Sequence, residues 1–367
     1  MHAVSVGEVQ AAWPLVREAR SKGWKDPVVL TTITRTGRKM AENLVGTDAD
    51  LMAYYPWDAP WIASRAIENL SPAAFVTVET EVWPNLVFGL ARRKIPAFIV
   101  NGRFSERSFR KAVSNRDFWR SVMSTFRLVM VRGEDDAFRL LELGLDRSRV
   151  IVGGDCKVDA LLARRANMDL QEVRKSIGAG DGPVLLAGST HSGEESVVLE
   201  AFGMVRKKNP AARLVIAPRH PERAGSVESM AREYGRVGSF SRPDQKWDIL
   251  VLDEVGHLFG LYGIAVSAFV GGSLVPKGGQ NILEPAVWGT LMQHGPHMED
   301  FKPHAEALGR LGAAVTVGNS TDLADAWAND LSGAKSNGQS GREYVEGLGG
   351  ASALSWEHIR GILNDRE

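Results

Sequence analysis

The sequence has little of what metal centres, disulfide scaffolds and membrane spans require. It contains one cysteine, Cys156, which excludes an intrachain disulfide and a thiolate metal cluster and fits a reducing compartment. Its histidines are sparse and show no spacing typical of a zinc site, so we expect no metal. No run of about 18 apolar residues occurs, so no segment is predicted to span a bilayer.

The charge is balanced, and this limits the partners that composition alone can suggest. Lys and Arg together number 44, as do Asp and Glu, so the net charge gives no reason to expect nucleic acid. Hydrophobic residues make up 44% of the chain and charged residues 24%, as in ordinary globular proteins. With 367 residues the chain is long enough for two domains, each with its own core.

Short runs rich in Val, Ile and Leu alternate with amphipathic stretches along the chain, which predicts parallel sheets covered by helices on both faces. The predicted strands are 2–6, 27–32, 50–54, 74–78, 96–101, 127–131 and 149–152 in the first half, and 184–188, 213–217, 235–239, 249–252, 264–270 and 313–316 in the second. The predicted helices are 8–21, 36–45, 60–70, 83–93, 106–113, 133–143, 192–208, 221–233, 254–260, 281–288, 320–330 and 351–364.

The α/β alternation is interrupted once, by the glycine-rich segment 178–183, where we place the link between two domains. The predicted domains are 1–177 and 178–345, with the last helix, 351–364, packing back on the first domain and a loop at 333–341. We expect two similar doubly wound halves that face each other across a cleft. In such sheets ligands bind at the carboxyl ends of the strands.

The stretch 268–286 has the strongest features of a ligand site. A predicted buried strand opens into Gly271 and Gly272, and a second pair of glycines follows Lys277 before a predicted helix. Glycines allow backbone N–H groups to approach a ligand, and a helix N-terminus favours a phosphate. Glu284, one turn further on, suits a ribose diol. The alternative is a tight strand–helix connection with a solvated Lys and Glu.

Two turns of the first half offer carboxylates and hydroxyls at predicted strand ends. Glu8 stands at the start of a predicted helix, where a carboxylate can accept a proton from a bound hydroxyl. It can equally be a first-turn residue that only complements the helix dipole. The segment 31–37 carries four threonines, which suit a phosphate or sugar but are also common in strands and caps.

Two further turns of the first half pair acidic and basic residues with aromatic ones. Glu79 and Glu81 precede a Trp-Pro helix start and suggest a substrate-facing loop. From Arg103 to Arg127 basic residues are interleaved with Phe and Trp. That mixture suits a surface that meets phosphates and acyl chains together, such as an anionic membrane, although a solvated basic helix over a core has the same composition.

Two turns of the second half have small or rigid residues. The segment 188–195 joins a strand to a helix through Gly, Ser and Thr and can hold a phosphate. In 217–223 two prolines make a rigid turn, so Arg219 and His220 are expected to point outward, with the Arg fork toward phosphate oxygens.

Taken together, these segments resemble the 3-deoxy-D-manno-octulosonic acid (Kdo) transferases, which glycosylate lipid A in Gram-negative bacteria. The segments that match, in the family's order, are HAVSVGE, TTITRTG, ETEVWPN, NGRFSERS, GDCKVD, GSTHSGEE, APRHPER, FVGGSLVPKGGQNILEPA and GPHMEDF. The resemblance reaches from residue 2 to residue 301. It implies the GT-B fold of two Rossmann-like domains, CMP-Kdo as donor, and the lipid A precursor as acceptor.

The resemblance also implies roles for individual residues. Glu8 is expected to be the catalytic base of an inverting transfer that needs no metal or other cofactor. By the same resemblance, Arg219 with the turn 188–190 is expected to hold the CMP phosphate, and Asn281 and Glu284 the nucleotide. Together with the residues singled out from their turns above, the candidate donor-binding residues are Ser189, Thr190, Arg219, His220, Gly271, Gly272, Ser273, Lys277, Gly278, Gly279, Asn281 and Glu284, and the candidate acceptor-binding residues are Thr34, Thr36, Glu79, Glu81, Arg103 and Arg107.

The chain departs from the family pattern at two positions and at its start. Gln280 and His257 stand where the family usually has His and Glu. Met1 lies directly on the first predicted strand, so we expect the native protein to begin further upstream. The family's N-terminal anchor segment is absent, so we expect a peripheral protein at the cytoplasmic face of the inner membrane. Two other hypotheses are another GT-B enzyme, such as a UDP-sugar transferase or epimerase, and an inactive paralogue.

Overall fold

The computed structural model describes residues 1–242, 246–333 and 337–364. The chain folds into two compact units. The first comprises Met1–Ala163 and the chain from Leu348 onward, and the second comprises Arg164–Gly347. This division falls before the predicted link at 178–183. The reason is helix α9 (Leu170–Ser176), which packs against α12 (Leu258–Ile264) of the second unit.

The first unit contains a parallel sheet whose strands follow the predicted positions closely. They are β1 (Val29–Thr32), β2 (Leu51–Tyr54), β3 (Phe75–Val78), β4 (Ala97–Gly102), β5 (Leu128–Val131) and β6 (Val150–Val152). Strand β1 pairs with β2, and β3 to β6 pair in chain order. His2 bridges Thr31 and Thr77 and so joins the two parts. The predicted strand 2–6 is wrong beyond its start, because Ser5 caps a helix that begins at Val6.

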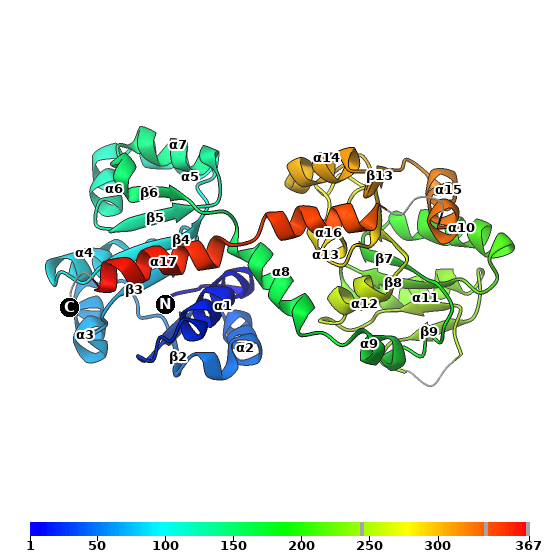
Figure 1. Cartoon of the computed structure of the whole chain (residues 1–367), viewed down its shortest axis with the longest axis horizontal. Helices are drawn as coiled ribbons and strands as arrows, with labels where there is room; N and C mark the ends of the chain where they lie inside the picture. The colour runs from blue at the N-terminus through cyan, green and yellow to red at the C-terminus, as the bar shows by residue number, and fades with distance from the viewer. Residues whose placement is uncertain (243–245, 334–336, 365–367) are drawn as a thin grey trace. The chain divides into compact units, whose positions relative to one another are not determined.

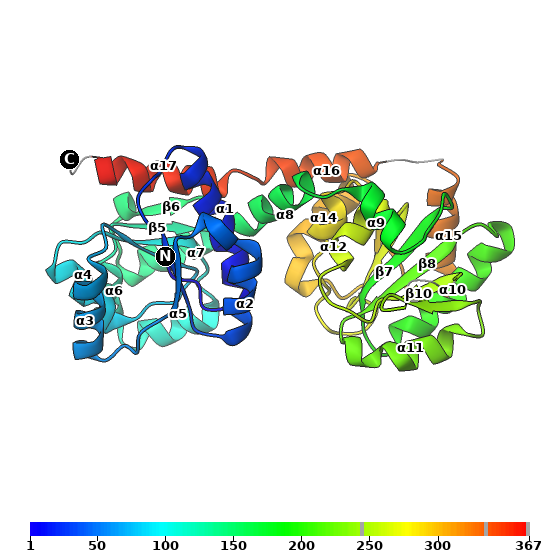
Figure 2. The same cartoon turned by 90° about the horizontal axis from the view of Figure 1, so that it is seen from below.

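Helices cover both faces of this sheet (Figure 1). They are α1 (Val6–Ser21), α2 (Arg35–Leu44), α3 (Pro60–Leu70), α4 (Pro84–Arg92), α5 (Glu106–Val113), α6 (Arg116–Met123), α7 (Glu134–Leu143), α8 (Cys156–Ala166) and α17 (Ala351–Asn364). Along β4, Phe98 and Val100 enter the core with α1 and α17, whereas Ala97 and Ile99 pack with α3, α4, α6 and α7. This alternation is what buries a sheet on two sides. Helix α17 lies beside α1 in Figures 1 and 2.

The described residues of the second unit form a seven-stranded parallel sheet in the order β13-β12-β11-β7-β8-β10-β9. The strands are β7 (Val184–Thr190), β8 (Arg213–Pro218), β9 (Val237–Ser239), β10 (Ile249–Val251), β11 (Ser267–Val270), β12 (Leu291–His294) and β13 (Ala314–Thr316). Strand β12 was not predicted because it contains Gln293 and His294. Gln293 is buried and accepts hydrogen bonds from Ser267 and Trp327, which makes a polar residue tolerable there.

The helices of the second unit also lie on both faces of its sheet (Figure 1). Besides α9 and α12 they are α10 (Glu194–Lys208), α11 (Ala224–Ala231), α13 (Leu283–Ala286), α14 (Lys302–Arg310), α15 (Ser320–Leu331) and α16 (Gly338–Gly347). Leu185 and Ala187 of β7 pack with α10, α11 and α15, and Val184 and Leu186 pack on the α12 side. No helix in the described ranges is long and apolar enough to span a membrane.

Two predictions in this unit are wrong. The predicted helix 281–288 is only the four-residue α13, so its end dipole is weak. The predicted loop 333–341 lies partly outside the described residues, and from Gly338 onward it is helix α16. The glycines that suggested a loop are needed for close packing, since a Cβ on Gly338 would lie 1.9 Å from the Gly289 carbonyl oxygen.

Candidate active site

Glu8 lies in the first turn of α1, with its side chain held against the start of its own helix. Its Oε2 accepts a hydrogen bond from the Val4 N–H at 2.6 Å, and its Oε1 accepts one from the Ser5 hydroxyl at 3.2 Å. The Ser-x-x-Glu spacing is that of a capping box, here with the N–H of the residue before the cap as donor. Only 7% of Glu8 is exposed, so the carboxylate is mostly enclosed.

The protonation of Glu8 is unusual for a carboxylate. The pKa of Glu8 is raised to about 7, chiefly by burial and also by the nearby charges of Glu79 and Glu81, while the hydrogen bonds from Val4 and Ser5 act in the opposite direction. A carboxyl group that titrates near pH 7 can accept and release a proton under physiological conditions. The enclosed position is therefore compatible with either predicted role, cap or base.

Glu79 and Glu81 lie in the turn after β3, close enough to influence Glu8 electrostatically. Glu79 has a positive φ of 59°, and its Oε1 forms an ion pair with the Lys157 ammonium at 2.6 Å. The pKa of Glu81 is raised by burial and by the charge of Glu79. No group of three or more His, Cys, Asp or Glu side chains in the described part of the chain is arranged to hold a metal ion.

The other candidate acceptor residues lie at different distances from the acidic group formed by Glu8, Glu79 and Glu81. Thr34 caps α2 and donates its hydroxyl to the Val4 carbonyl at 3.2 Å, so it adjoins Glu8 through Val4. The Thr36 hydroxyl is directed at Thr34, 3.4 Å away. The Arg103 carbonyl accepts from the Thr80 hydroxyl, which ties Arg103 to the Glu79–Glu81 turn. Arg107 is exposed on α5, and the structure shows no contact that joins it to the group.

In the second unit, one buried carboxylate organises the glycine loop. Glu194, at the start of α10, accepts hydrogen bonds from the backbone N–H groups of His191 and Gly272 on Oε2, both at 2.8 Å. Its Oε1 accepts from Ser273 and Leu274, both at 2.9 Å. The side chain is 0% exposed. Glu194 thus ties the turn after β7 to the turn after β11.

This arrangement corrects the predicted use of the glycine loop. The N–H groups of Gly271, Gly272 and Ser273 already have acceptors within the protein, so they do not fit the expected role of phosphate donors. The Ser273 hydroxyl is buried and occupied by Val270 and Gly295. Gly278 and Gly279 have φ of 81° and 78°, and any Cβ on them would collide with Asp300 or Met298. These glycines are therefore needed for packing and backbone geometry.

The side chains around these two turns, together with those of the turn after β8, form a cationic corner. We use this name for His191, Arg219, His220 and Lys277. The rings of His191 and His220 are 5.9 Å apart between centroids. Burial lowers the pKa of His191, and His220, Lys277 and Arg219 lower it further, so all three lie within electrostatic reach of His191. Arg219, His220 and Lys277 are exposed, which leaves this corner open to an anion.

Ser189 and Thr190 end strand β7 and directly precede His191 of the corner. Ser189 has a positive φ of 55° at the end of β7. The buried Thr190 donates its hydroxyl to Glu195 and accepts the Arg219 N–H on its carbonyl, so its hydroxyl is already used. The amide of Gln280, one of the departures from the family pattern, lies 3.5 Å from His191 Nε2. His257, the other departure, lies 3.6 Å from Glu254 and stacks near Phe240.

Asn281 and Glu284 lie next to the cationic corner. The Asn281 side chain accepts from the Leu283 N–H at 3.1 Å. Burial raises the pKa of Glu284, while Arg164, Asn281 and Arg219 act in the opposite direction. The Arg164 guanidinium is in turn fixed over the Phe259 ring, 4.1 Å from its centroid. Glu284 is thus a partly enclosed acceptor within electrostatic reach of Arg164 and Arg219.

Sequence reasoning missed three of the residues that build these sites. His191 and Glu194 lie inside the quoted segment 188–195, and Lys157 lies inside 154–159, yet none was assigned a role. Their partners are distant in the chain, with 78 positions between Lys157 and Glu79 and also between Glu194 and Gly272. The sequence did contain one signal, the Ser-Gly-Glu-Glu helix start. It has two adjacent acidic residues, whereas capping a helix requires only one.

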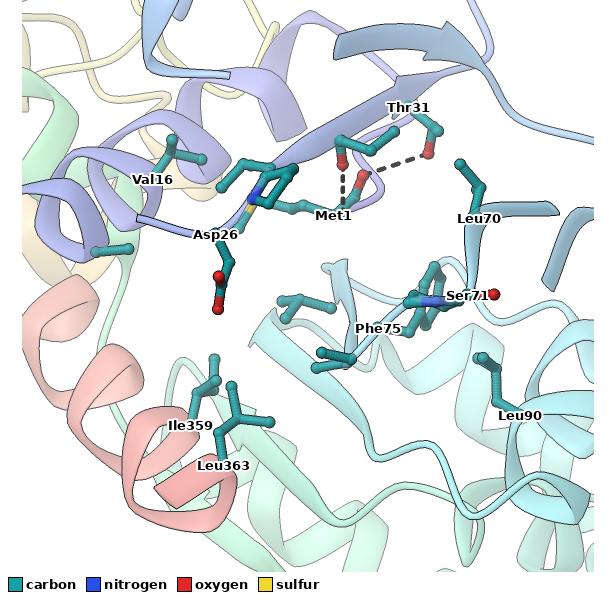
Figure 3. Close-up of a pocket in the computed structure, with 18 of the residues that line it drawn as sticks. Met1, Val16, Asp26, Thr31, Leu70, Ser71, Phe75, Leu90, Ile359 and Leu363 are labelled. Atoms are coloured by element: carbon teal, nitrogen blue, oxygen red, sulfur yellow. Dashed lines mark hydrogen bonds between the residues drawn. The ribbon is translucent and has the colours of Figure 1, made fainter. Parts of the chain in front are cut away.

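A separate pocket of about 450 Å³ lies in the first unit (Figure 3). It is mainly apolar and lies at the amino-terminal ends of β1 and β3, with residues of α1, α3, α4 and α17 around it. Met1 lines it, and burial lowers the pKa of the Met1 amino group to about 5. None of the candidate site residues lines this pocket, so it is distinct from the group around Glu8.

Comparison with solved structures defines the fold class of the chain. A UDP-GlcNAc 2-epimerase from Neisseria meningitidis, bound to UDP-GlcNAc, superposes with a TM-score of 0.69 at 15% identity, covering 98% of this chain and all of that one. A glycosyltransferase from Rickettsia africae gives 0.60 at 14% identity, covering 100% and 96%. The fold is therefore that of the GT-B glycosyltransferases and epimerases, with two Rossmann-like halves, as predicted.

Sequence comparison identifies the family within this class. The family model of 3-deoxy-D-manno-octulosonic-acid transferase (kdotransferase) matches residues 1–160. The transferase of Haemophilus influenzae is 30% identical over 99% of this chain and 84% of its own length, and that of Bordetella pertussis is 32% identical over 90% and 78%. The chain belongs to the Kdo transferase family and is a glycosyltransferase, which confirms the resemblance found in its motifs.

Proposed function

We propose that the chain transfers Kdo from CMP-Kdo to the lipid A precursor, lipid IVA, in the synthesis of the lipopolysaccharide core, with inversion at the anomeric carbon. Membership of the Kdo transferase family supports the sugar and the reaction class. The observation that carries the mechanism is Glu8, an enclosed carboxylate at a helix start whose pKa is raised to about 7.

In the proposed step, Glu8 accepts the proton of an acceptor hydroxyl as its oxygen attacks the anomeric carbon of Kdo. The bond from that carbon to the phosphate oxygen breaks, and CMP leaves with the electron pair. The hydrogen bonds from Val4 and Ser5 fix the orientation of Glu8 before the acceptor arrives. Such positioning, with a pKa near the working pH, is what general base catalysis requires.

The leaving CMP gains negative charge, and the cationic corner suits it. Arg219, Lys277 and His191, with the Ser189 hydroxyl, are proposed to hold the phosphate, and Asn281 and Glu284 the ribose. Arg219 and Lys277 supply positive charge that offsets the charge developing on the leaving group, whereas His191, whose pKa is lowered, supplies a neutral hydrogen-bonding ring. The proposed mechanism draws on these side chains and on no metal or other cofactor.

The acceptor and the membrane are assigned to the first unit. Thr34, Glu79 and Glu81 adjoin Glu8, and Thr36 and Arg103 lie next to them. Helices α5 and α6 present exposed basic residues, including Arg107 and Lys111, beside the exposed apolar side chains of Val113 and Phe118. We propose that this face meets the anionic surface of the inner membrane on its cytoplasmic side, where the lipid acceptor lies.

The test is transfer of Kdo from CMP-Kdo to lipid IVA by the purified chain, with the product identified by mass. Glu8→Gln is expected to lose transfer while retaining CMP binding by calorimetry, because the CMP contacts are elsewhere. Glu18→Gln, on the same helix, is the matched control and is expected to remain active. Near-normal turnover of Glu8→Gln would remove Glu8 as the base. Binding of UDP in preference to CMP would favour a UDP-sugar enzyme.

A further inference from the structure

Lys157 places a cation beside the proposed base. It lies in the first turn of α8, and its ammonium is 2.6 Å from Glu79 Oε1. The same ammonium lies over Gly7, since a Cβ built there would be 3.5 Å from Nζ. The Lys157 side chain is 36% exposed and that of Glu79 is 20% exposed. The ammonium is therefore held in place yet open to a ligand on one side.

The chemistry of the transferred sugar makes this position informative. An ulosonic acid carries its carboxylate on the anomeric carbon, where the new bond forms. The acceptor oxygen that Glu8 deprotonates must bond to this carbon, so the substrate carboxylate comes within a few ångströms of Glu8. Glu79 and Glu81 already crowd this region with negative charge. A further carboxylate requires a cation to offset the repulsion.

Among the described residues, the ion pair that reaches this acidic group is the one between Lys157 and Glu79. An ammonium has three N–H donors and can bind a second carboxylate or exchange one for another. Its flexible stem allows the small movement required. Glu79 then acts as an internal substitute for the ligand, keeping Lys157 in place while the site is empty.

We propose that Lys157 binds the carboxylate of the transferred sugar acid, and that Glu79 holds the lysine ready for it. This inference rests on the proposed function, and it gives the chain a residue for selecting sugar acids over neutral sugars. The competing explanation is that the ion pair only stabilises the turn after β3 against α8. The two explanations differ in what happens when each partner is changed separately.

The experiment measures KM for CMP-Kdo and kcat, at saturating lipid IVA, for the wild type, Lys157→Met, Lys157→Arg and Glu79→Gln. Losing a charge-assisted contact is expected to raise the donor KM of Lys157→Met about ten- to a hundredfold. Lys157→Arg retains the charge, so its donor KM is expected to lie between that of the wild type and that of Lys157→Met. Glu79→Gln keeps a hydrogen-bond acceptor but competes less for the lysine, so its donor KM is expected to fall or stay within about twofold. Thermal melting verifies that each variant is folded.

Each outcome decides between the explanations. A donor KM that rises in Lys157→Met but falls or stays within about twofold in Glu79→Gln supports carboxylate binding. An equal rise of the donor KM in both variants overturns it, because that is the result of breaking a scaffold pair. An unchanged donor KM in Lys157→Met also overturns it while leaving the proposed function intact. A wild type that transfers nothing from CMP-Kdo refutes the proposed function and this inference with it.

Discussion

The role of Glu194 in the second unit leads to a strong prediction about stability. Each of its two carboxylate oxygens accepts two backbone N–H groups: Oε2 from His191 and Gly272, and Oε1 from Ser273 and Leu274. Replacing Glu194 by Gln converts one oxygen into an amide group. Two buried N–H donors then face another donor instead of an acceptor, with no water in reach because the side chain is 0% exposed.

The magnitude follows from the number of hydrogen bonds lost. A buried donor left without an acceptor costs about 1–3 kcal/mol, so two of them are expected to cost about 2–6 kcal/mol. This is a large part of the roughly 5–15 kcal/mol that stabilises a typical domain. For a unit of this size it corresponds to a fall in melting temperature of roughly 5–20 °C. The glycine loop would also lose its tie to the turn after β7, so CMP affinity is expected to fall.

The assay is calorimetric unfolding of the full chain, in which the transition of the second unit is expected to shift and that of the first to stay in place. Glu200→Gln on the same helix is the control, since Glu200 is exposed and its replacement is expected to change little. A shift for Glu194→Gln no larger than that of the control would refute the reasoning, since it would mean that the four contacts contribute no net stability.

Three further predictions concern pH and packing. The rate of transfer is expected to rise with pH through about 7 as Glu8 ionises. Glu79→Gln is expected to move this rise to lower pH, because removing a neighbouring negative charge lowers the pKa of Glu8. A pH–rate profile of both proteins tests the two expectations. The pKa of Asp248 is lowered, chiefly by Arg236. The stability that the ionised Asp248 contributes is therefore present above its ordinary pKa of 3.8 and is lost as the pH falls below that value. Melting curves of Asp248→Asn should show a smaller loss of stability over this pH range. Gly338→Ala is expected to destabilise by about 1–3 kcal/mol through its clash with Gly289, whereas Gly347→Ala in the same helix meets nothing within 4 Å and should be neutral, as urea unfolding will tell.

The sequence predicted most elements because their signals are local. Runs of Val, Ile and Leu separated by amphipathic stretches appear at almost every strand of both sheets. The errors share a physical cause. Strand β12 contains buried polar residues that only distant partners satisfy, and α16 contains glycines that only a close backbone contact explains. In each case tertiary packing overrides the local preference.

The candidate sites show the same division. The motifs identified the segments that carry Glu8, Glu79, Arg219 and Lys277, because glycine, proline and acidic residues at strand ends are visible in the chain. The internal partners of these segments were not visible. The N–H groups of Gly272 and Ser273 are satisfied by Glu194, so these two backbone groups do not fit the phosphate role expected from the sequence.

By itself, the sequence determined the α/β architecture, the family and the turns at which ligands are expected, since these depend on residue types at short spacing. Only the tertiary structure decided that Glu8 is enclosed beside other carboxylates, that Lys157 reaches Glu79, and that Glu194 occupies the glycine loop. These properties arise from charges and hydrogen-bond partners brought together from distant parts of the chain, and no local pattern encodes which of several acids and bases will meet.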